Sequence, residues 1–313
     1  MTLALSVLGV ACGGSDGVGG GPVTAAVHTP GLPSTYTDPD GLTTEITSAA
    51  RIVSLSGDFS EIVWELGLGD NLVAVDLSSV YPKEEMRFLP KIGVEFRLFA
   101  EPILAAEPTV VIGDSDARPP EVIEQLREAG VPVVIFPSRF GLDAPAVKIR
   151  EVAAVLGVPE RGEALATTVQ AEIDDAVALA TGAVGTPAVT LLYIASDDTF
   201  LLLGRNTAAE GMLAAAGADD VGPEAGSGSP FVPLTPEALA GAAPDVIITA
   251  ERGFNEVGGL EGFLELPGVA QTPAAATGSV LVYEDLYLLG LGPRTGQALR
   301  EIVLDLHPEL SDG

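Results

Sequence analysis

The sequence predicts an α/β protein of two lobes that are joined by one long α-helix. Three observations predict this class. Short, continuously apolar runs alternate with amphipathic runs, a pattern typical of parallel sheets covered by helices. A long amphipathic run over 159–182 separates two such series, and one segment of the first series is echoed in the second. A chain of 313 residues is long enough for two domains.

The composition supports a folded, acidic protein. The formal net charge is -29, with 15 Lys and Arg against 44 Asp and Glu, and this balance excludes nucleic acid as an expected partner. Hydrophobic residues make up 47% of the chain and fall in patterned runs, so a sizeable core can form.

The first twelve residues, "MTLALSVLGVAC", are a short apolar run that ends in small residues at the single cysteine. This pattern predicts a lipoprotein signal over 1–12, with cleavage before Cys12 and a lipid on its sulfur. Residues 13–50 are rich in Gly, Pro, Ser and Thr and are expected to be a flexible linker. The alternative is an incidental free cysteine. No later segment reaches the ~20 apolar residues of a membrane helix.

The first lobe is expected over 51–157. Strands are predicted at 51–56, 71–76, 109–114 and 131–137, and helices at 58–67 and 119–130. Gly67 and Gly130 end the two helices, and the prolines at 119–120 begin the second one. Alternation of strand and helix makes this an α/β lobe.

The connecting helix is expected over 158–184. Leu165, Val169, Ile173 and Val177 recur every four residues, which is the spacing of one helical face. The second lobe is expected over 185–313, with strands at 188–194, 245–249 and 280–285 and helices at 207–217 and within 292–306.

An internal echo supports two similar lobes. "AEPILAAEPTVVIG" (100–113) matches "PEALAGAAPDVIIT" (236–249), and each copy reads as a short helix that leads into an apolar strand. Glu101 and Glu237 fall in register, each seven residues before a proline.

The parts of common enzyme sites are missing from the sequence. The only histidines are His28 and His307, and no HExxH, paired cysteines or Gly-x-Ser-x-Gly occur. We therefore expect no enzyme and no catalytic cofactor. An α/β enzyme with its site in a cleft at the ends of the sheet strands is a weaker alternative, although the sequence shows no pair of nucleophile and base to support it.

Several motifs carry a family resemblance. "RIVSLSGDFSEIVWELGLGDNLVAVD", "YP" at 81–82, "LPKIG", "EQLREAGVPVV" and "VGGLEGFLELPGVAQTPAA" with "GLGPRT" resemble the cluster-binding type (class III) of periplasmic substrate-binding protein of ABC importers. Within that type the chain is most similar to hemin-binding lipoproteins. The resemblance covers about residues 50–308.

The resemblance implies two Rossmann-like lobes on a rigid helix, with the ligand in a cleft between them. It also implies that Glu101 and Glu237 dock onto arginines of the permease, whereas the residues alone would allow ordinary solvated glutamates at helix starts. The implied partners are an ABC permease, its ATPase and a small iron chelate. The implied location is extracytoplasmic, with only a lipid anchor in the membrane, and a monomer is expected.

Tyr193, in "LLYIASDD", lies where the resemblance implies an axial haem ligand, and a phenolate suits ferric iron. Two positions depart from the family pattern. Val94 stands where the first lobe often has a tyrosine or histidine, and Ala195 stands where an arginine commonly supports the tyrosine. The alternative is a strand tyrosine that is bonded only to backbone.

Further candidates come from the loops that follow the strands, because open α/β sheets bind ligands there. Arginines suit ligand carboxylates and aromatic rings suit flat ligands. The first-lobe candidates are Ser56, Asp58, Ser79, Tyr81, Arg97, Arg118 and Arg139, and the second-lobe candidates are Tyr193, Arg205, Phe231, Tyr287 and Arg294.

The predicted function is that of a solute-binding lipoprotein that captures haem (hemin) and delivers it to a permease. A ferric siderophore or cobalamin is the alternative ligand. A sensor or adhesion lipoprotein without a transport role is the alternative from another class.

Overall fold

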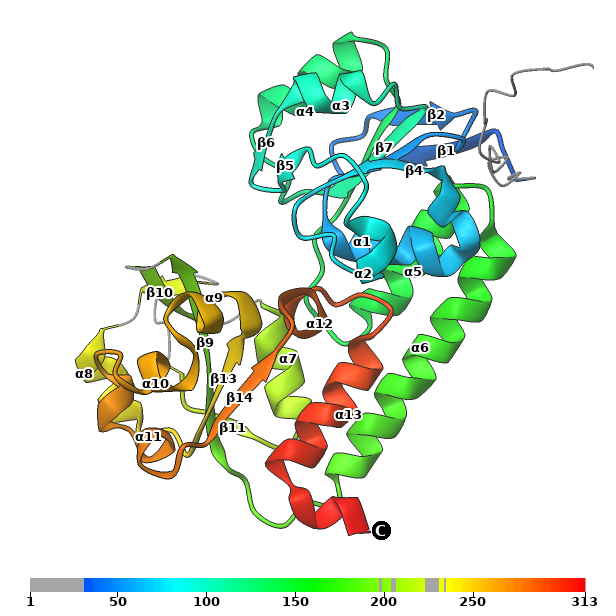
Figure 1. Cartoon of the computed structure of the whole chain (residues 1–313). Helices are drawn as coiled ribbons and strands as arrows, with labels where there is room; N and C mark the ends of the chain where they lie inside the picture. The colour runs from blue at the N-terminus through cyan, green and yellow to red at the C-terminus, as the bar shows by residue number, and fades with distance from the viewer. Residues whose placement is uncertain (1–30, 197–198, 204–206, 223–230, 234, 313) are drawn as a thin grey trace, which may run out of the picture.

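The computed structural model describes residues 31–196, 199–203, 207–222, 231–233 and 235–312. Figure 1 shows two lobes beside one long helix, α6 (Pro159–Ala180). The predicted α/β class with two lobes and a connecting helix is confirmed. We call residues 31–157 the N-lobe and residues 185–312 the C-lobe.

The N-lobe contains a four-stranded parallel sheet in the order β4-β3-β7-β8. Its strands are β3 (Ile52–Ser54), β4 (Leu72–Val75), β7 (Val110–Asp114) and β8 (Val133–Phe136). Most of their residues are buried, because helices cover the sheet on both faces. This explains why the strands read as continuous apolar runs.

The N-lobe helices are α1 (Gly57–Val63), α2 (Lys83–Met86), α3 (Ala100–Ala105), α4 (Pro120–Glu128) and α5 (Ala144–Val155). After α1 the chain continues as a π-helical segment, η1 (Trp64–Leu68), and a 3-10 turn, η2 (Gly69–Asn71). Gly67 ends the helix as expected, since its φ of 72° lies in the left-handed region that favours glycine.

Residues 34–46 differ from the expected linker. They form an antiparallel hairpin of β1 (Ser34–Thr37) and β2 (Thr43–Ile46). Ile46 is fully buried, and the ring of Tyr36 meets Phe136 edge-on at 4.9 Å between centroids. The hairpin therefore belongs to the N-lobe, because its inward side chains complete the core beside α5 and β8.

A second hairpin connects α2 to α3. Its strands are β5 (Gly93–Val94) and β6 (Arg97–Leu98). Gly93 has a φ of 110°, and a Cβ there would lie 2.6 Å from the carbonyl oxygen of Arg97, so only glycine fits.

The C-lobe sheet is mixed, although we expected a parallel sheet. Its order is β12-β10-β9-β13-β14, with β11 paired to β9. Strands β9 (Ala188–Ser196), β13 (Val246–Ala250) and β14 (Val280–Tyr283) run parallel, as the apolar runs predicted. The short strand β11 (Asp219–Asp220), which was not predicted, also pairs in parallel with β9. Strands β10 (Thr199–Leu203) and β12 (Phe231–Pro233) add an antiparallel extension beyond β9.

The C-lobe helices are mostly short. They are α7 (Ala208–Ala215), α8 (Pro236–Ala242), α9 (Glu251–Glu256), α10 (Gly259–Leu264), α11 (Pro273–Thr277), α12 (Asp285–Leu289) and α13 (Thr295–Leu306), with 3-10 turns η3 (Val269–Gln271) and η4 (Pro308–Asp312).

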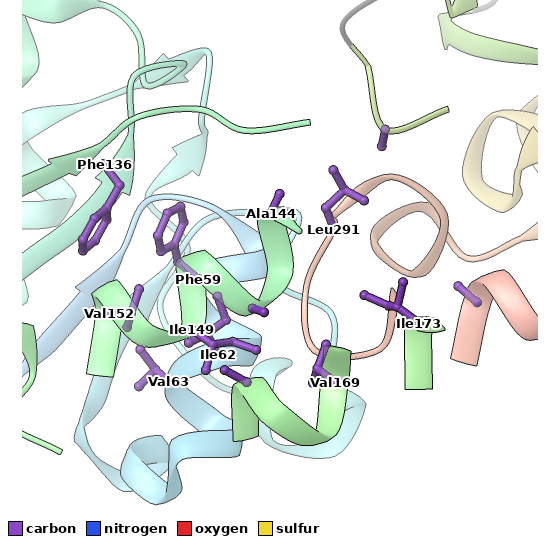
Figure 2. Packing of buried hydrophobic residues seen from close by; sticks show 14 of the residues in the cluster. Phe59, Ile62, Val63, Phe136, Ala144, Ile149, Val152, Val169, Ile173 and Leu291 are labelled. Atoms are coloured by element: carbon purple, nitrogen blue, oxygen red, sulfur yellow. The ribbon is translucent and has the colours of Figure 1, made fainter. Parts of the chain in front are cut away.

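Helix α6 packs against α5 of the N-lobe and α13 of the C-lobe. Two glycines permit this close approach: a Cβ on Gly162 would lie 2.2 Å from the Cβ of Ala153, and one on Gly296 would lie 2.5 Å from the Cβ of Glu172. One buried apolar cluster includes Phe59 and Ala144 of the N-lobe, Ile173 of α6 and Leu291 of the C-lobe (Figure 2). The helix and both lobes thus share a core.

None of the helices in the described ranges combines the length and the apolar character that are needed to cross a membrane.

Candidate functional site

Two sheet edges carry the loops in which open α/β sheets bind ligands. We call the loops after β3, β4, β7 and β8 the N-lobe edge, and the loops after β9, β13 and β14 the C-lobe edge. In Figure 1, α9 and α12, which follow β13 and β14, lie on the side of the C-lobe that is turned toward the N-lobe. In this view the β5–β6 hairpin is at the lower side of the N-lobe, above the level of α9.

Tyr193 lies near the carboxyl end of β9, on the C-lobe edge, and is half-buried. Its phenolic oxygen accepts a hydrogen bond of 2.9 Å from Nη2 of Arg252, and the guanidinium carbon lies 5.9 Å from the centroid of its ring. The hydroxyl is therefore bonded to a cationic side chain and is not limited to a backbone partner.

Arg252 was not predicted as a site residue. It stands in the first turn of α9, directly after β13, and β13 pairs with β9. Asp285 of α12 fixes it from the other side: Oδ1 lies 3.4 Å from Nε of Arg252, and Oδ2 accepts a hydrogen bond of 3.0 Å from its backbone amide. The available sequence signal is an arginine two residues after the end of a buried parallel strand.

The β5–β6 hairpin belongs to the N-lobe edge. Backbone hydrogen bonds join Leu77, after β4, to Gly93, and Arg118, after β7, to Glu95 and Leu98. Arg97, a predicted ligand residue, is exposed on this hairpin, and none of the carboxylates in the described ranges forms an ion pair with it. Arg97 is thus a free cation at the N-lobe edge.

Glu95 and Asp114 form an acid pair at the same edge. The two buried carboxyl groups interact, and adjacent carboxyl groups of this kind cannot both ionise readily. Burial and the neighbouring Asp114 raise the pKa of Glu95 to about 10, and burial and Asp58 raise the pKa of Asp114 to about 6. Oε1 of Glu95 is buried without a hydrogen-bond partner. Glu95 is therefore the protonated partner at neutral pH.

Large apolar side chains are exposed around the N-lobe edge. Leu77 and Val80 follow β4, Phe96 is the turn of the β5–β6 hairpin, and Phe140 follows β8. Phe96 is 73% exposed, so its ring is open to contact with a ligand or a partner. The edge thus offers an apolar surface of a kind that suits a flat ligand.

Arg294, Tyr81 and Tyr287 come together where the lobes meet. The guanidinium of Arg294 lies 4.0 Å from the ring centroid of Tyr81, which is in the N-lobe, and 5.0 Å from that of Tyr287. It also makes a two-fold ion pair with Glu61, at 3.0 and 3.1 Å. Arg294 therefore contacts the other two predicted ligand residues, and its charge is already paired.

Ser56 and Asp58 are buried beneath the N-lobe edge. The Ser56 hydroxyl donates a hydrogen bond of 2.5 Å to Asp58, whose other oxygen is 2.5 Å from Nζ of Lys148. Ser79, which is 1% exposed, donates to Asp76 at 2.7 Å. These predicted residues lie in an internal polar network under the loops.

Arg118 and Arg139 have partners within the N-lobe. Arg118 is exposed and donates to the carbonyl oxygens of Ser115 and Ala117, at 2.6 and 2.9 Å. Arg139 pairs with Glu151 at 2.8 Å. Their ligand roles stay predictions.

Glu101 and Glu237 occupy equivalent places in the two lobes. Each is exposed in the first turn of a short helix, α3 or α8. Phe231 belongs to β12. Cys12 and Arg205 lie outside the described residues.

A surface hollow lies away from both edges. It is lined by Glu65, Leu66, Gly67, Arg161, Ala164, Leu165 and Thr168, between η1 and α6, and has a volume of about 480 Å³. In the described ranges no three His, Cys, Asp or Glu residues are placed to hold a bare metal ion.

Comparison with known proteins gives a consistent result. The profile of the family described as "Periplasmic binding protein" matches residues 52–286. Among solved structures, the periplasmic heme-binding protein RhuT from Roseiflexus sp. RS-1, in its apo form, is 47% identical in sequence, with a TM-score of 0.80, over 83% of this chain and 98% of that chain.

Two curated relatives are also similar. A cobalamin-binding protein of Halobacterium salinarum is 26% identical over 279 residues, which cover 87% of this chain and 74% of the relative. An uncharacterized ABC transporter substrate-binding lipoprotein of Bacillus subtilis, YvrC, is 24% identical over 83% of this chain and 80% of the relative.

Proposed function

Since this chain belongs to the periplasmic binding protein family, we propose that it is the substrate-binding protein of an ABC importer and that its cargo is haem. The observation that carries the choice of haem is the bond between Tyr193 and Arg252 at the C-lobe edge. Tyrosine is an established axial ligand of haem iron, and a phenolate suits the ferric state. The similarity to a heme-binding protein at 47% identity agrees with this choice.

The N-lobe edge suits the rest of a haem molecule. Phe96 and Phe140 are exposed rings that can cover the apolar face of a porphyrin. Arg97 is an exposed cation on the same hairpin as Phe96, and it suits a propionate carboxylate. In this proposal iron is bound from the C-lobe, while the N-lobe supplies apolar cover and charge.

A titration with hemin tests the proposal. The wild-type protein should give a phenolate-type charge-transfer band, and Tyr193→Phe should lack it, because phenylalanine has no oxygen to bind iron. Tyr36→Phe is the matched control, since Tyr36 packs on Phe136 in the N-lobe. If Tyr193→Phe and wild type give the same spectrum, Tyr193 is not the ligand.

Cobalamin is the second candidate cargo. Val94, at the N-lobe edge, has no atom that binds iron, and a relative named for cobalamin binding matches 87% of this chain. Calorimetric titration with hemin, with cyanocobalamin and with a panel of ferric siderophores decides between them. If cyanocobalamin binds and hemin gives no heat of binding, the cargo is cobalamin and not haem.

Delivery would use Glu101 and Glu237. Both carboxylates are exposed on first turns of helices in different lobes, so together they form an anionic dock with two points of contact. We propose that they meet arginines of the permease. We also propose that the chain works as a monomer outside the cytoplasm, held to the membrane by a lipid on Cys12; YvrC, a relative, is named as a lipoprotein.

A further inference from the structure

The lobes are joined by more than α6. Residues 290–294, between α12 and α13 of the C-lobe, lie against α1 and α5 of the N-lobe. Gly292 lies in van der Waals reach of α1, since a Cβ there would be 3.7 Å from the Cβ of Asp58. Gly57 also lies close to α12: a Cβ on it would be 2.7 Å from the carbonyl oxygen of Ser78 and 2.9 Å from Cδ1 of Leu286.

Two charged groups fix this segment to the N-lobe. Arg294 makes its two-fold ion pair with Glu61 of α1, and the exposed fractions of the two side chains are 15% and 2%. Lys148 of α5 donates a hydrogen bond of 3.0 Å to the carbonyl oxygen of Gly290 while it pairs with Asp58. Directional contacts of this kind define one relative position and weaken steeply when the groups move apart.

Apolar contacts of Leu291 also hold this segment against the N-lobe. Leu291 is 3% exposed and belongs to the same buried cluster as Phe59 and Ala144 (Figure 2). Its φ of 45° is in the left-handed region that leucine rarely adopts. Backbone strain of this kind persists only where the surroundings determine the conformation, as the N-lobe contacts do here.

Glu284 connects this segment to α12. One of its oxygens is 3.2 Å from Nη2 of Arg294, and its carboxylate accepts the backbone amides of Leu286 and Tyr287 at the start of α12. The helix that follows β14 at the C-lobe edge is therefore tied through Arg294 to α1, which follows β3 at the N-lobe edge.

We propose that residues 290–294 are an interlobe clamp, which fixes the distance between the two edges before any ligand arrives. The clamp holds the lobes through Arg294, Leu291 and the carbonyl of Gly290, on the side of α12. Because α6 is a second connection, the lobes are attached to each other at two places. They therefore cannot rotate freely about either attachment. The proposal does not depend on the identity of the cargo.

Pulsed electron paramagnetic resonance tests the clamp on the protein without ligand. Spin labels at Glu124→Cys in α4 and Glu261→Cys in α10, in a Cys12→Ser background, report the distance between the lobes; both label positions are exposed. We expect one narrow distance distribution, and in Arg294→Met a broader distribution that extends to longer distances. Circular dichroism establishes that each variant is folded.

Two further variants make the test decisive. Arg127→Met removes an arginine that pairs with Asp38 at 3.0 Å inside the N-lobe, so the distribution should stay narrow. Leu291→Ala truncates an apolar side chain of the clamp and should broaden the distance distribution. This variant provides the test if Arg294→Met fails to fold. Folded clamp variants with the wild-type distribution would overturn the proposal, and so would equal broadening in Arg127→Met.

Discussion

Arg252 donates a hydrogen bond of 2.9 Å to the phenolic oxygen of Tyr193, although 59 positions separate the two residues in the chain. The sequence has Ala195 where an arginine was expected to support this tyrosine. The structure supplies a guanidinium from a different element, the first turn of α9. The neighbouring strands β9 and β13 bring the two side chains together at the C-lobe edge.

Replacing Arg252 by alanine should weaken hemin binding and leave the fold intact. The side chain of Arg252 is 47% exposed, so we expect a loss of about 1 kcal/mol, or roughly fivefold to tenfold in Kd. Titration with hemin, followed by absorbance, measures the change. Arg87→Ala is the matched control, because Arg87 is an exposed arginine that pairs with Glu84 in the N-lobe. Unchanged affinity in Arg252→Ala would remove Arg252 from the site.

Replacing Glu95 by glutamine should change how stability depends on pH. The pKa of Glu95 is raised to about 10 in the folded protein, so its contribution to stability is complete below its unfolded pKa and is lost as the pH rises toward 10. Glutamine stays neutral throughout. We expect Glu95→Gln to be more stable than wild type at pH 8, by about 1 kcal/mol or more, and similar near pH 4.

Urea unfolding at both pH values measures this difference. Glu124→Gln, on an exposed glutamate of α4, serves as the control for the loss of one negative charge. Equal stabilisation at both pH values would show that Glu95 does not gain a proton on folding.

The double variant Glu101→Arg with Glu237→Arg should abolish uptake of the cargo while hemin affinity stays unchanged. Two reversed charges would repel a basic docking surface on the permease. Uptake by cells and hemin titration of the purified protein are measured together. Glu121→Arg, which alters another exposed first-turn glutamate, in α4, should leave uptake intact. Lost hemin affinity in the double variant would point to a role in the ligand site.

The variant Cys12→Ala should lose lipid. Cells that are grown with radioactive palmitate should label the wild-type protein and not the variant, because the sulfur of Cys12 is the proposed attachment point. The protein should also move from the membrane fraction to the medium or periplasm. Label that persists in Cys12→Ala would reject the anchor.

Most of the architecture could be predicted because its signals are local. The strand at 109–114 and the helix at 159–182 are defined by apolar periodicity within one segment. The hairpin at 34–46 was missed because its strands are short and rich in threonine, and only Ile46 is an aliphatic side chain that becomes buried. The turn residues at 38–41, "DPDG", were the available signal.

The site was less predictable because its partners come from different strands. Nothing near Tyr193 in the sequence identifies Arg252, and nothing near Glu95 identifies Asp114. Their proximity depends on the order of strands in each sheet, which one sequence does not determine. For the same reason Arg294 was read as a free cation for a ligand, whereas it pairs with Glu61, which lies 233 positions earlier.

Phe88, Phe96, Phe99 and Phe140 leave between 41% and 74% of their surfaces in water. At neutral pH the net charge of -29 keeps copies of the chain apart by repulsion. Near the isoelectric point, about pH 4.1, this repulsion disappears, and the exposed phenylalanine rings of different copies can associate. We therefore expect the solubility of the protein to be lowest near pH 4.1, where charge repulsion no longer opposes association through the exposed rings of the N-lobe.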